Sequence, residues 1–355
     1  MVTQICLRVA ERFQAHPWSV LTCPKGWWHI MADALGMTRR LSLDRIANAA
    51  TVIDPVFLNS PQFRPESVER QLDCRVVVKM ETLNPIRSFK GRGTEYLVSC
   101  LAGRPHLVCA TAGNFGQGMA YSARKRGLTL TIFASVTANP LKVERMRVLG
   151  ADVRLTGEDF DAAHLAAAAF AAETGAQLIE DGRDVAIAEG AGTIGVELLR
   201  WPEPFDAILV PLGDGALLAG VARWVKAHQP ATQVIGVCAS GAPAMERSWR
   251  AGQVQELESA NTIADGISVR SPFPEALFDL LGVVDDILLV DDEALVTVMR
   301  LAHREIGVVL EPAGAAGLAA LLTNKQRFRG QLTSTILTGG NITTEQMDGW
   351  LAPRN

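Results

Sequence analysis

The chain has 355 residues, of which 48% are hydrophobic and 20% are charged, and its net charge is −4. A weakly acidic chain without a basic stripe argues against nucleic acid as a partner, and no apolar run approaches the ~20 residues that cross a bilayer. The six cysteines are irregularly spaced and include no C-x-x-C pair. This argues against a disulfide framework or a metal site such as a zinc cage, and favours reduced thiols in the cytoplasm.

The N-terminal segment 1–36 shows no helical or strand period, although it holds three of the seven tryptophans. We interpret it as a disordered or extra extension; the alternative is an accessory segment that packs through its tryptophans. Beyond it, Leu43, Ile46 and Ala50 have helical spacing. We therefore expect the folded part of the chain to begin near residue 37.

From residue 75 onward, strand patterns and helix patterns alternate. We expect strands in the segments 75–81, 106–111, 128–135, 151–156, 205–213, 232–240, 285–292 and 334–341. We expect helices in the segments 92–103, 113–127, 140–150, 159–175, 216–228, 293–306 and 313–323. This order predicts an α/β fold of parallel sheets with helices on both faces, in which ligands bind beyond the carboxyl ends of the strands.

A glycine turn, Gly213-Asp214-Gly215, follows one predicted strand and precedes a helix. Glycines let backbone N–H groups approach a phosphate, and the helix start adds partial positive charge. The sequence matches neither G-x-x-x-x-G-K-[ST] nor G-x-G-x-x-G, which excludes the usual nucleotide and dinucleotide motifs. The turn is therefore a candidate phosphate cradle, with an ordinary tight turn as the alternative.

Two further turns follow predicted strands. In "CATAGNFGQG" (109–118), a hydroxyl, an amide and free N–H groups at a helix start suit a carboxylate, although a capped helix start would look the same. In "LTGGN" (337–341), a strand delivers Thr338 to a double-glycine turn. If the strands are parallel, these turns lie near one sheet edge.

Lys90 stands in "SFKGRG", behind Ser-Phe and ahead of Gly-Arg-Gly. A single lysine is ordinarily a surface charge. An amine that lies in a pocket beside a phosphate cradle and a carboxylate cradle can instead form a Schiff base. The phosphate-bearing aldehyde that suits such a site is pyridoxal 5'-phosphate, which acts as an electron sink.

These motifs resemble the fold-type II pyridoxal-phosphate enzymes, in particular the threonine/serine dehydratase branch of this tryptophan synthase beta-like family. The resemblance covers roughly residues 40–345, and the motifs stand in family order. They are "SFKGRG", "TAGNFGQG", "GDGAL", "TIADGISV" (262–269), "EPAGAAG" (311–317) and "TGGN". Each motif is weak alone, and the set is specific.

The resemblance implies roles for individual residues. Lys90 would hold the cofactor and move the α-proton of the substrate, and Thr338 would face the pyridine nitrogen. The other cofactor contacts would come from Phe89, Asn114, Gly213, Asp214, Gly215, Ala216 and Leu217. Substrate contacts would come from Ser88, Thr111, Ala112, Gly113, Asn114, Phe115 and Glu311. A neutral hydroxyl at the ring nitrogen favours prompt loss of a β-substituent over transamination.

The resemblance also implies two three-layer αβα domains with the active site between them. Residues 37–105 plus 184–355 would form a large cofactor-binding domain, and residues 106–183 a small inserted α/β domain. The protein would be an ammonia-lyase that dehydrates a 3-hydroxy amino acid such as threonine or serine to a 2-keto acid and ammonia. We also expect a homodimer.

Several positions depart from the family pattern. Arg87 stands where the family has glycine; it would recognise a second acidic group on the substrate or simply point outward. Phe115 replaces a histidine, which would admit a bulkier substrate such as phenylserine or would be neutral packing. Ala112 replaces the serine base of the racemases, so we expect little racemase activity. The segment after 234–237 lacks the carboxylates that bind a metal in some members, so we expect no metal there.

Two other hypotheses remain open. Within the family, β-replacement or a threonine-synthase-like reaction is the alternative to dehydration. Gly91 after the lysine and the "TIADG" stretch favour dehydration. From another class, the protein would bind the ligand without turnover, as the unusual Arg87 and Asp214 allow.

Overall fold

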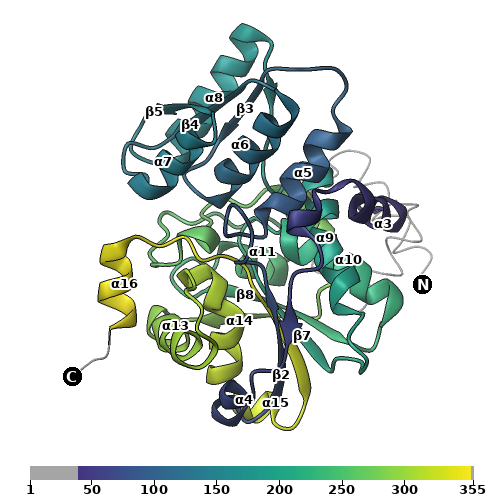
Figure 1. Cartoon of the computed structure of the whole chain (residues 1–355). Helices are drawn as coiled ribbons and strands as arrows, with labels where there is room; N and C mark the ends of the chain where they lie inside the picture. Colours follow the sequence, from purple (N-terminus) through teal and green to yellow (C-terminus); the bar gives the residue numbers. More distant parts are fainter. Residues whose placement is uncertain (1–38, 353–355) are drawn as a thin grey trace, which may run out of the picture.

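The computed structural model describes residues 39–352, so the interpretation of residues 1–36 lies outside the described residues (Figure 1). Two β-sheets organise this part of the chain. The six-stranded sheet has the order β1 (Gln62–Phe63), β2 (Arg75–Met80), β10 (Leu332–Leu337), β7 (Ala207–Pro211), β8 (Gln233–Ala239) and β9 (Asp286–Val290). The four-stranded sheet has the order β5 (Asp152–Leu155), β4 (Leu130–Ala134), β3 (Leu107–Ala110) and β6 (Gln177–Leu178). All neighbouring strands are parallel except β1 and β2.

Helices connect the strands. In the first half of the chain they are α3 (Leu43–Val52), α4 (Glu66–Leu72), α5 (Lys90–Cys100), α6 (Asn114–Arg126), α7 (Pro140–Val148) and α8 (Phe160–Thr174). In the second half they are α9 (Val185–Leu198), α10 (Ala216–His228), α11 (Ala244–Ala251), α12 (Pro274–Leu280), α13 (Asp292–Ile306), α14 (Pro312–Thr323), α15 (Lys325–Phe328) and α16 (Thr344–Leu351). None of these described helices has the length and apolar character that crossing a bilayer requires.

The six-stranded sheet is buried on both faces. Along β7, Ile208 and Val210 pack with α9 and α10, whereas Ala207 and Leu209 pack with α13 and α14. Successive side chains of a strand point to opposite faces, so a strand covered on both sides reads as a continuous apolar run. This explains why the sequence pattern could place β7.

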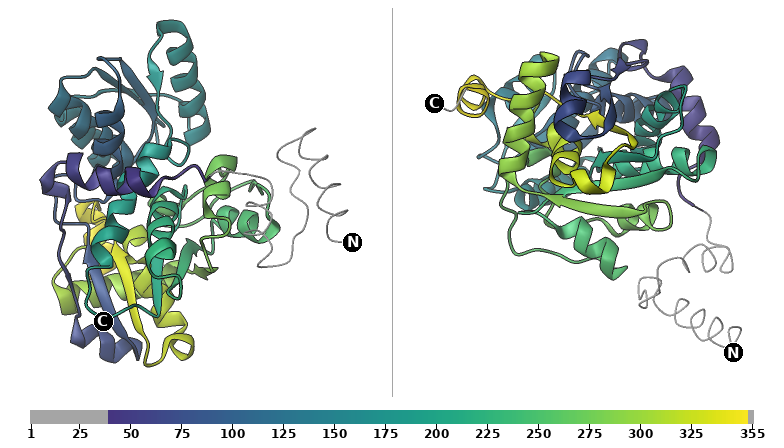
Figure 2. Two further views of the ribbon diagram at one scale, coloured as in Figure 1. Left: turned by 90° about the vertical axis from the view of Figure 1, so that its right-hand side faces the viewer. Right: turned by 90° about the horizontal axis from the view of Figure 1, so that it is seen from below.

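The four-stranded sheet has the same three layers. Cys109 and Ile132 pack with α6 and α7 on one face, and Val108 and Phe133 pack with α8 on the other. Figure 1 and the left view of Figure 2 show this sheet and its helices at one end of the molecule, above the six-stranded sheet. The prediction of an α/β fold with two parallel-rich, three-layer units is confirmed.

Some local expectations were right and others wrong. Helix α8 begins after Asp159, whose side chain accepts a hydrogen bond from the Ala162 N–H, and ends before Gly175 in a left-handed conformation. The helix expected over 92–103 instead begins at Lys90, and its C-cap is Leu101 rather than a glycine.

Helix α9 was missed because it contains three glycines, which are poor helix formers. These glycines allow close packing between two helices: a Cβ at Gly192 would lie 3.1 Å from the Gly220 carbonyl oxygen of α10. A Cβ at Gly220 would in turn lie 2.0 Å from the Ala188 carbonyl oxygen of α9. Tertiary packing therefore overrides the helix propensity here.

Candidate active site

Lys90 is the first residue of α5 and faces a cavity of about 900 Å³. The preceding turn is tied to the turn after β10, because the Phe89 N–H donates to the Thr338 carbonyl (3.0 Å) and Ser88 bridges to Gly339. The Lys90 ammonium forms an ion pair with Asp181 and lies 5.0 Å from the centre of the Phe89 ring. The Lys90 side chain, only 15% exposed, is thus largely enclosed beside an aromatic ring and a carboxylate.

Two glycines in the first turn of α5, Gly91 and Gly93, flank Arg92. A Cβ at Gly91 would lie 2.3 Å from the Phe57 ring, and one at Gly93 would lie 2.6 Å from the Ile187 carbonyl oxygen. Glycine is therefore required sterically on both sides of Arg92, which is buried completely. The two glycines of Gly-Arg-Gly therefore allow α5 to pack closely against Phe57 and Ile187.

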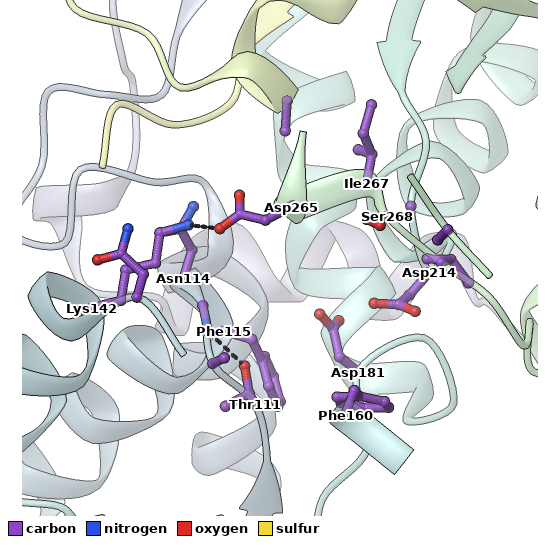
Figure 3. A pocket seen from close by; sticks show the side chains of 18 of the residues that line it. Thr111, Asn114, Phe115, Lys142, Phe160, Asp181, Asp214, Asp265, Ile267 and Ser268 are labelled. Atoms are coloured by element: carbon purple, nitrogen blue, oxygen red, sulfur yellow. Dashed lines mark hydrogen bonds and ion pairs between the residues drawn. The ribbon is translucent and has the colours of Figure 1, made fainter. Parts of the chain in front are cut away.

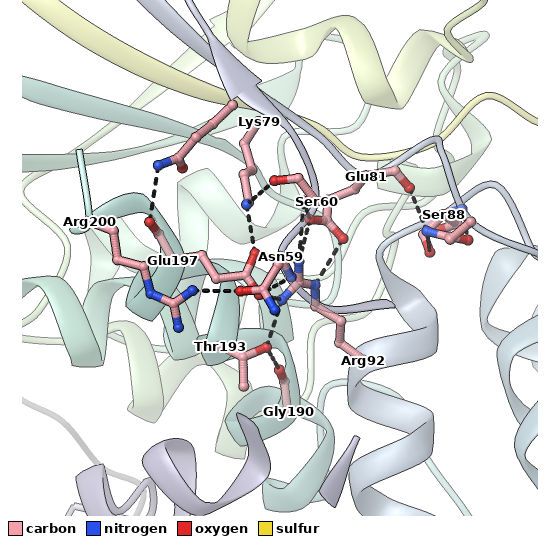
Figure 4. A network of polar contacts seen from close by, with 12 residues as sticks. Asn59, Ser60, Lys79, Glu81, Ser88, Arg92, Gly190, Thr193, Glu197 and Arg200 are labelled. Carbon is pink, nitrogen blue, oxygen red and sulfur yellow. Dashed lines mark hydrogen bonds and ion pairs between the residues drawn. The ribbon is translucent and has the colours of Figure 1, made fainter. Parts of the chain in front are cut away.

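Arg92 is the centre of a buried polar network (Figure 4). Its guanidinium donates to both carboxylate oxygens of Glu81 (2.7 and 2.9 Å) and of Glu197 (2.7 and 2.9 Å). Lys79 adds a second cation 2.6 Å from Glu197, so two positive and two negative side chains balance. Burial alone would raise the pKa of Glu197, but Arg92 and Lys79 outweigh it and lower this pKa to about 2. The network anchors the helix that carries Lys90.

The turn between β3 and α6 supplies polar groups at the cavity wall. The Gly113 N–H donates to Thr111 Oγ1 (3.1 Å), and a Cβ at Gly113 would meet nothing within 4 Å. Asn114 donates from Nδ2 to Glu311 Oε1 (2.5 Å) and accepts at Oδ1 from Asn341 Nδ2 (2.8 Å). The backbone at Gly113 therefore borders open space. The side-chain amide of Asn114 is held in place by Glu311 and Asn341.

The turn between β7 and α10 is shaped by its glycines. Gly215 has φ of +98°, which side chains disfavour, and a Cβ at Gly213 would lie 2.9 Å from the Gly266 carbonyl oxygen. Between them, the Asp214 carboxylate points toward that of Asp181 (Figure 3). Burial and the charge of Asp181 raise the pKa of Asp214 to about 7, against the opposing effect of Lys90.

A third carboxylate group lies across the cavity. Glu311 is the N-cap of α14, and burial raises its pKa although the Lys142 ammonium opposes this. Lys142, on α7, has a side chain only 2% exposed; its Nζ is 2.6 Å from Asp265 and 3.7 Å from Glu311. Lys142 thereby links a helix of the four-stranded unit to two segments of the six-stranded unit.

The cavity lies between the two sheet units, at the carboxyl ends of β3, β4, β7 and β10. It collects nearly all of the residues singled out in the sequence: Phe89, Lys90, Thr111, Ala112, Gly113, Asn114, Phe115, Gly213, Asp214, Gly215, Ala216, Leu217, Glu311 and Thr338. Ser88 is fully buried behind the wall and does not line it. Among residues 39–352, no cluster of three or more His, Cys, Asp or Glu side chains could hold a metal ion.

Among the polar residues that line the cavity, the sequence did not single out the charged Lys142, Asp181 and Asp265. Lys142 lies in the helix expected over 140–150, and Asp265 lies in the motif at 262–269. Asp181 follows the strand β6, whose two residues are too short a pattern to detect. Arg87 was noted but does not line the cavity. It has a positive φ of 51°, and its charge acts with burial to lower the pKa of Arg145.

One cavity between two αβα units brings together Lys90, a glycine turn at a helix start, a hydroxyl-bearing turn and the 111–115 turn, which is the arrangement that the resemblance to fold-type II enzymes implies. Comparison with known proteins agrees. Residues 53–339 match the family model described as "Pyridoxal-phosphate dependent enzyme", and the chain belongs to this family. The resemblance seen in the sequence is thus confirmed, and the protein is a pyridoxal-phosphate-dependent enzyme.

Individual relatives are similar over most of their length. The biosynthetic L-threonine dehydratase IlvA of Lactococcus lactis is 32% identical, over 86% of this chain and 76% of the relative. The L-threonine ammonia-lyase of Thermotoga maritima is 35% identical, over 77% and 69% of the two chains. Among solved structures, maize serine racemase has a TM-score of 0.82 and 28% identity, and the match covers 87% of this chain and 96% of that one.

Proposed function

We propose that this protein is a pyridoxal-phosphate-dependent ammonia-lyase that removes the hydroxyl group of threonine or serine and yields a 2-keto acid and ammonia. The relatives named L-threonine dehydratase and L-threonine ammonia-lyase, at 32% and 35% identity, support this assignment. The observation that carries it is the position of Lys90 in one cavity with the 213–217 turn, the 111–115 turn and Thr338.

The cavity fits the cofactor. The 213–217 turn has the small residues and left-handed backbone that a phosphate cradle needs, and α10 begins at Ala216 with its N–H groups free of helix partners. The Phe89 ring beside the Lys90 amine offers an apolar surface for the pyridine ring. The N–H groups at the start of α10 therefore suit a phosphate, and the Lys90 amine suits an aldehyde.

We assign the residues as follows. Gly213, Asp214, Gly215, Ala216 and Leu217 would bind the phosphate through backbone N–H groups, and Phe89 would pack on the ring. Asn114 would bind the ring oxygen, and the Thr338 hydroxyl would bind the ring nitrogen. When bound, the cofactor draws electrons from Cα of an amino acid, which acidifies the α-proton and allows a β-hydroxyl group to leave. Lys90 Nζ holds the cofactor and accepts the α-proton.

The substrate carboxylate is assigned to the 111–114 turn, because this turn leads into the start of α6 and a Cβ at Gly113 would meet only open space in the cavity. Ser88 does not line the cavity and bridges to Gly339 in the turn after β10, and the side chain of Ala112 offers neither an acid nor a base. Glu311 lies between Asn114 and Lys142, where it orients the amide and faces the leaving group.

A second candidate is a dehydratase for a bulkier substrate such as phenylserine. Phe115 and Phe160 both line the cavity, and Phe115 is buried with its ring centre 6.0 Å from the Lys90 amine. Aromatic rings pack favourably against an aromatic substituent. The two candidates share every assigned cofactor contact and differ only in the size of the β-substituent.

Three further assignments, of domains, localisation and oligomeric state, accompany the proposed function. We divide the chain into a large domain of residues 37–105 plus 184–355 and a small domain of residues 106–183, since the four-stranded sheet is built entirely from residues 107–178. We place the enzyme in the cytoplasm, which suits the unpaired Cys74, Cys100, Cys109 and Cys238. We further expect a homodimer, which light scattering on the purified protein measures.

The function is tested by incubating the cofactor-loaded protein with L-threonine, L-serine, 3-phenylserine and 3-hydroxyaspartate. Formation of 2-keto acid and ammonia in equal amounts from threonine or serine supports the proposal. Turnover of phenylserine alone would select the second candidate, and a requirement for an added nucleophile would indicate β-replacement. Cofactor binding without ammonia from any of the four substrates would refute an ammonia-lyase.

A further inference from the structure

Two carboxylates meet at the candidate phosphate cradle. Asp214 is part of the glycine turn itself, and Asp181 lies on the 179–184 loop packed against it. A Cβ at Gly182 would lie only 2.7 Å from the Asp214 carbonyl oxygen and 2.9 Å from its Cβ. The two side chains point toward one another (Figure 3). A carboxylate in such a cradle opposes the binding of a phosphate, because like charges repel.

The surroundings provide one cation for this pair. Among the described residues, the charged groups that act on Asp214 are Asp181 and the Lys90 ammonium, which forms its ion pair with Asp181. Asp181 Oδ1 is buried without a hydrogen-bond partner. The thiol of Cys109, on β3, remains neutral because burial raises its pKa to about 12. Across the cavity, Asp265 is already paired with Lys142.

A bound phosphate monoester adds about 1.5 to 2 negative charges near neutral pH. With both carboxylates ionised, the cradle would then hold up to about four negative charges against one ammonium. Like charges at close range are relieved when one carboxyl group keeps its proton. A protonated carboxyl group also gains an O–H donor, whereas a carboxylate only accepts.

We propose that the Asp214 side chain is protonated when the phosphate binds, and that its O–H donates a hydrogen bond to the cofactor phosphate, while Asp181 stays the ion-pair partner of the Lys90 ammonium. This inference rests on the proposed function. It adds a hydrogen bond from the Asp214 side chain to the backbone N–H contacts already assigned to the phosphate. It also explains how an acidic residue is tolerated in the cradle: the pair carries one negative charge rather than two.

The consequence is a proton-linked affinity. The raised pKa of Asp214, about 7 without a ligand, rises further when the phosphate accepts the hydrogen bond. The site therefore binds the phosphate well below pH 7 and loses affinity as the pH rises above it. In this range one proton is taken up per phosphate bound, so the dissociation constant increases about tenfold for each pH unit.

The test uses pyridoxine 5'-phosphate, which carries an alcohol in place of the aldehyde and so binds without reaction at Lys90. Its dissociation constant is measured by calorimetry from pH 6 to pH 9 on the full chain. We expect the constant of the wild-type protein to rise by up to about a hundredfold from pH 7 to pH 9. The Asp214→Asn variant keeps a donor at every pH and should change less than about threefold over that interval.

Two further variants complete the design. Asp181→Asn removes the like charge, so the loss of affinity should begin at a lower pH than in the wild type. Asp73→Asn is the matched control: Asp73 is exposed and has a left-handed conformation that asparagine tolerates, and it should keep the wild-type profile.

A wild-type profile that is flat between pH 7 and pH 9 would overturn the protonation of Asp214 and leave the phosphate site intact, and so would a wild-type slope in Asp214→Asn. Absence of any binding by the wild-type protein at pH 6 would instead overturn the phosphate site, and the inference with it.

Discussion

The buried Arg92 gives the sharpest stability prediction. Replacing it with methionine keeps a long, flexible side chain but removes the cation that bonds Glu81 and Glu197. The remaining Lys79 neutralises only one of the two glutamates, so one buried negative charge is left without a cation. Breaking a buried ion pair from one side costs about 3–5 kcal/mol.

The pKa of Glu197 provides an independent magnitude. Its fall from 4.5 to about 2 corresponds to about 3 kcal/mol of stabilisation, because each pKa unit is worth about 1.4 kcal/mol. Since the pKa in the folded state is depressed, this contribution is present above pH 4.5 and disappears as the pH falls through 2. This figure is an upper limit for what Arg92 contributes through Glu197, because Lys79 supplies part of the lowering and remains in Arg92→Met.

The assay is urea unfolding followed by fluorescence and circular dichroism at a series of pH values. We expect the free energy of unfolding of Arg92→Met to lie about 3–5 kcal/mol below that of the wild type at pH 7. The difference should shrink as the pH falls from 5 toward 2. Arg92→Lys keeps the charge without the forked donors and should show a smaller loss. A difference under about 1 kcal/mol at pH 7, or one that does not change with pH, would refute this account of the network.

Four further predictions concern the site. Lys90→Ala should lower 2-keto acid formation by at least about 10²–10⁴-fold, measured with threonine. Gly215→Ala places a side chain at φ of +98°, a strain of about 1–3 kcal/mol, and should weaken cofactor binding about 5–150-fold in an absorbance titration. The wild type, with Ala112 in place of a second base, should racemise L-serine far more slowly than it releases ammonia; chiral chromatography showing the reverse would contradict this. Lys142→Met leaves Glu311 without its cation, so the pKa of that carboxyl group rises further and the pH profile of turnover should shift upward.

The sequence predicted those parts of the fold that follow from repeating local patterns. The strands β7 and β8 are continuous apolar runs because both faces of the sheet are covered, and α8 has a capping aspartate and a terminal glycine. Helix α9 could not be predicted in this way, because its glycines serve a contact with α10 that exists only in the folded protein. Helix α5 begins at Lys90 for a similar reason: Phe57 and Ile187 fix its position.

The candidate site was predicted to the extent that its residues lie in turns after strands. Parallel strands bring such turns to one edge, and fourteen residues named from the sequence line a single cavity. Asp181 and Lys142 were missed, because a lone aspartate after a two-residue strand and a lysine in a short helix carry no local signal. Their importance comes from long-range contacts with Lys90 and Glu311.

The most direct test of the central claim identifies the residue that holds the cofactor. The protein is loaded with pyridoxal 5'-phosphate, reduced with borohydride to fix any Schiff base, digested and analysed by mass spectrometry. Our account predicts a reduced cofactor on the peptide that contains Lys90. Lys142, the other lysine lining the cavity, is the internal control and should remain unmodified, since its amine is held by Asp265. A label on Lys142, or on no lysine, would contradict the account.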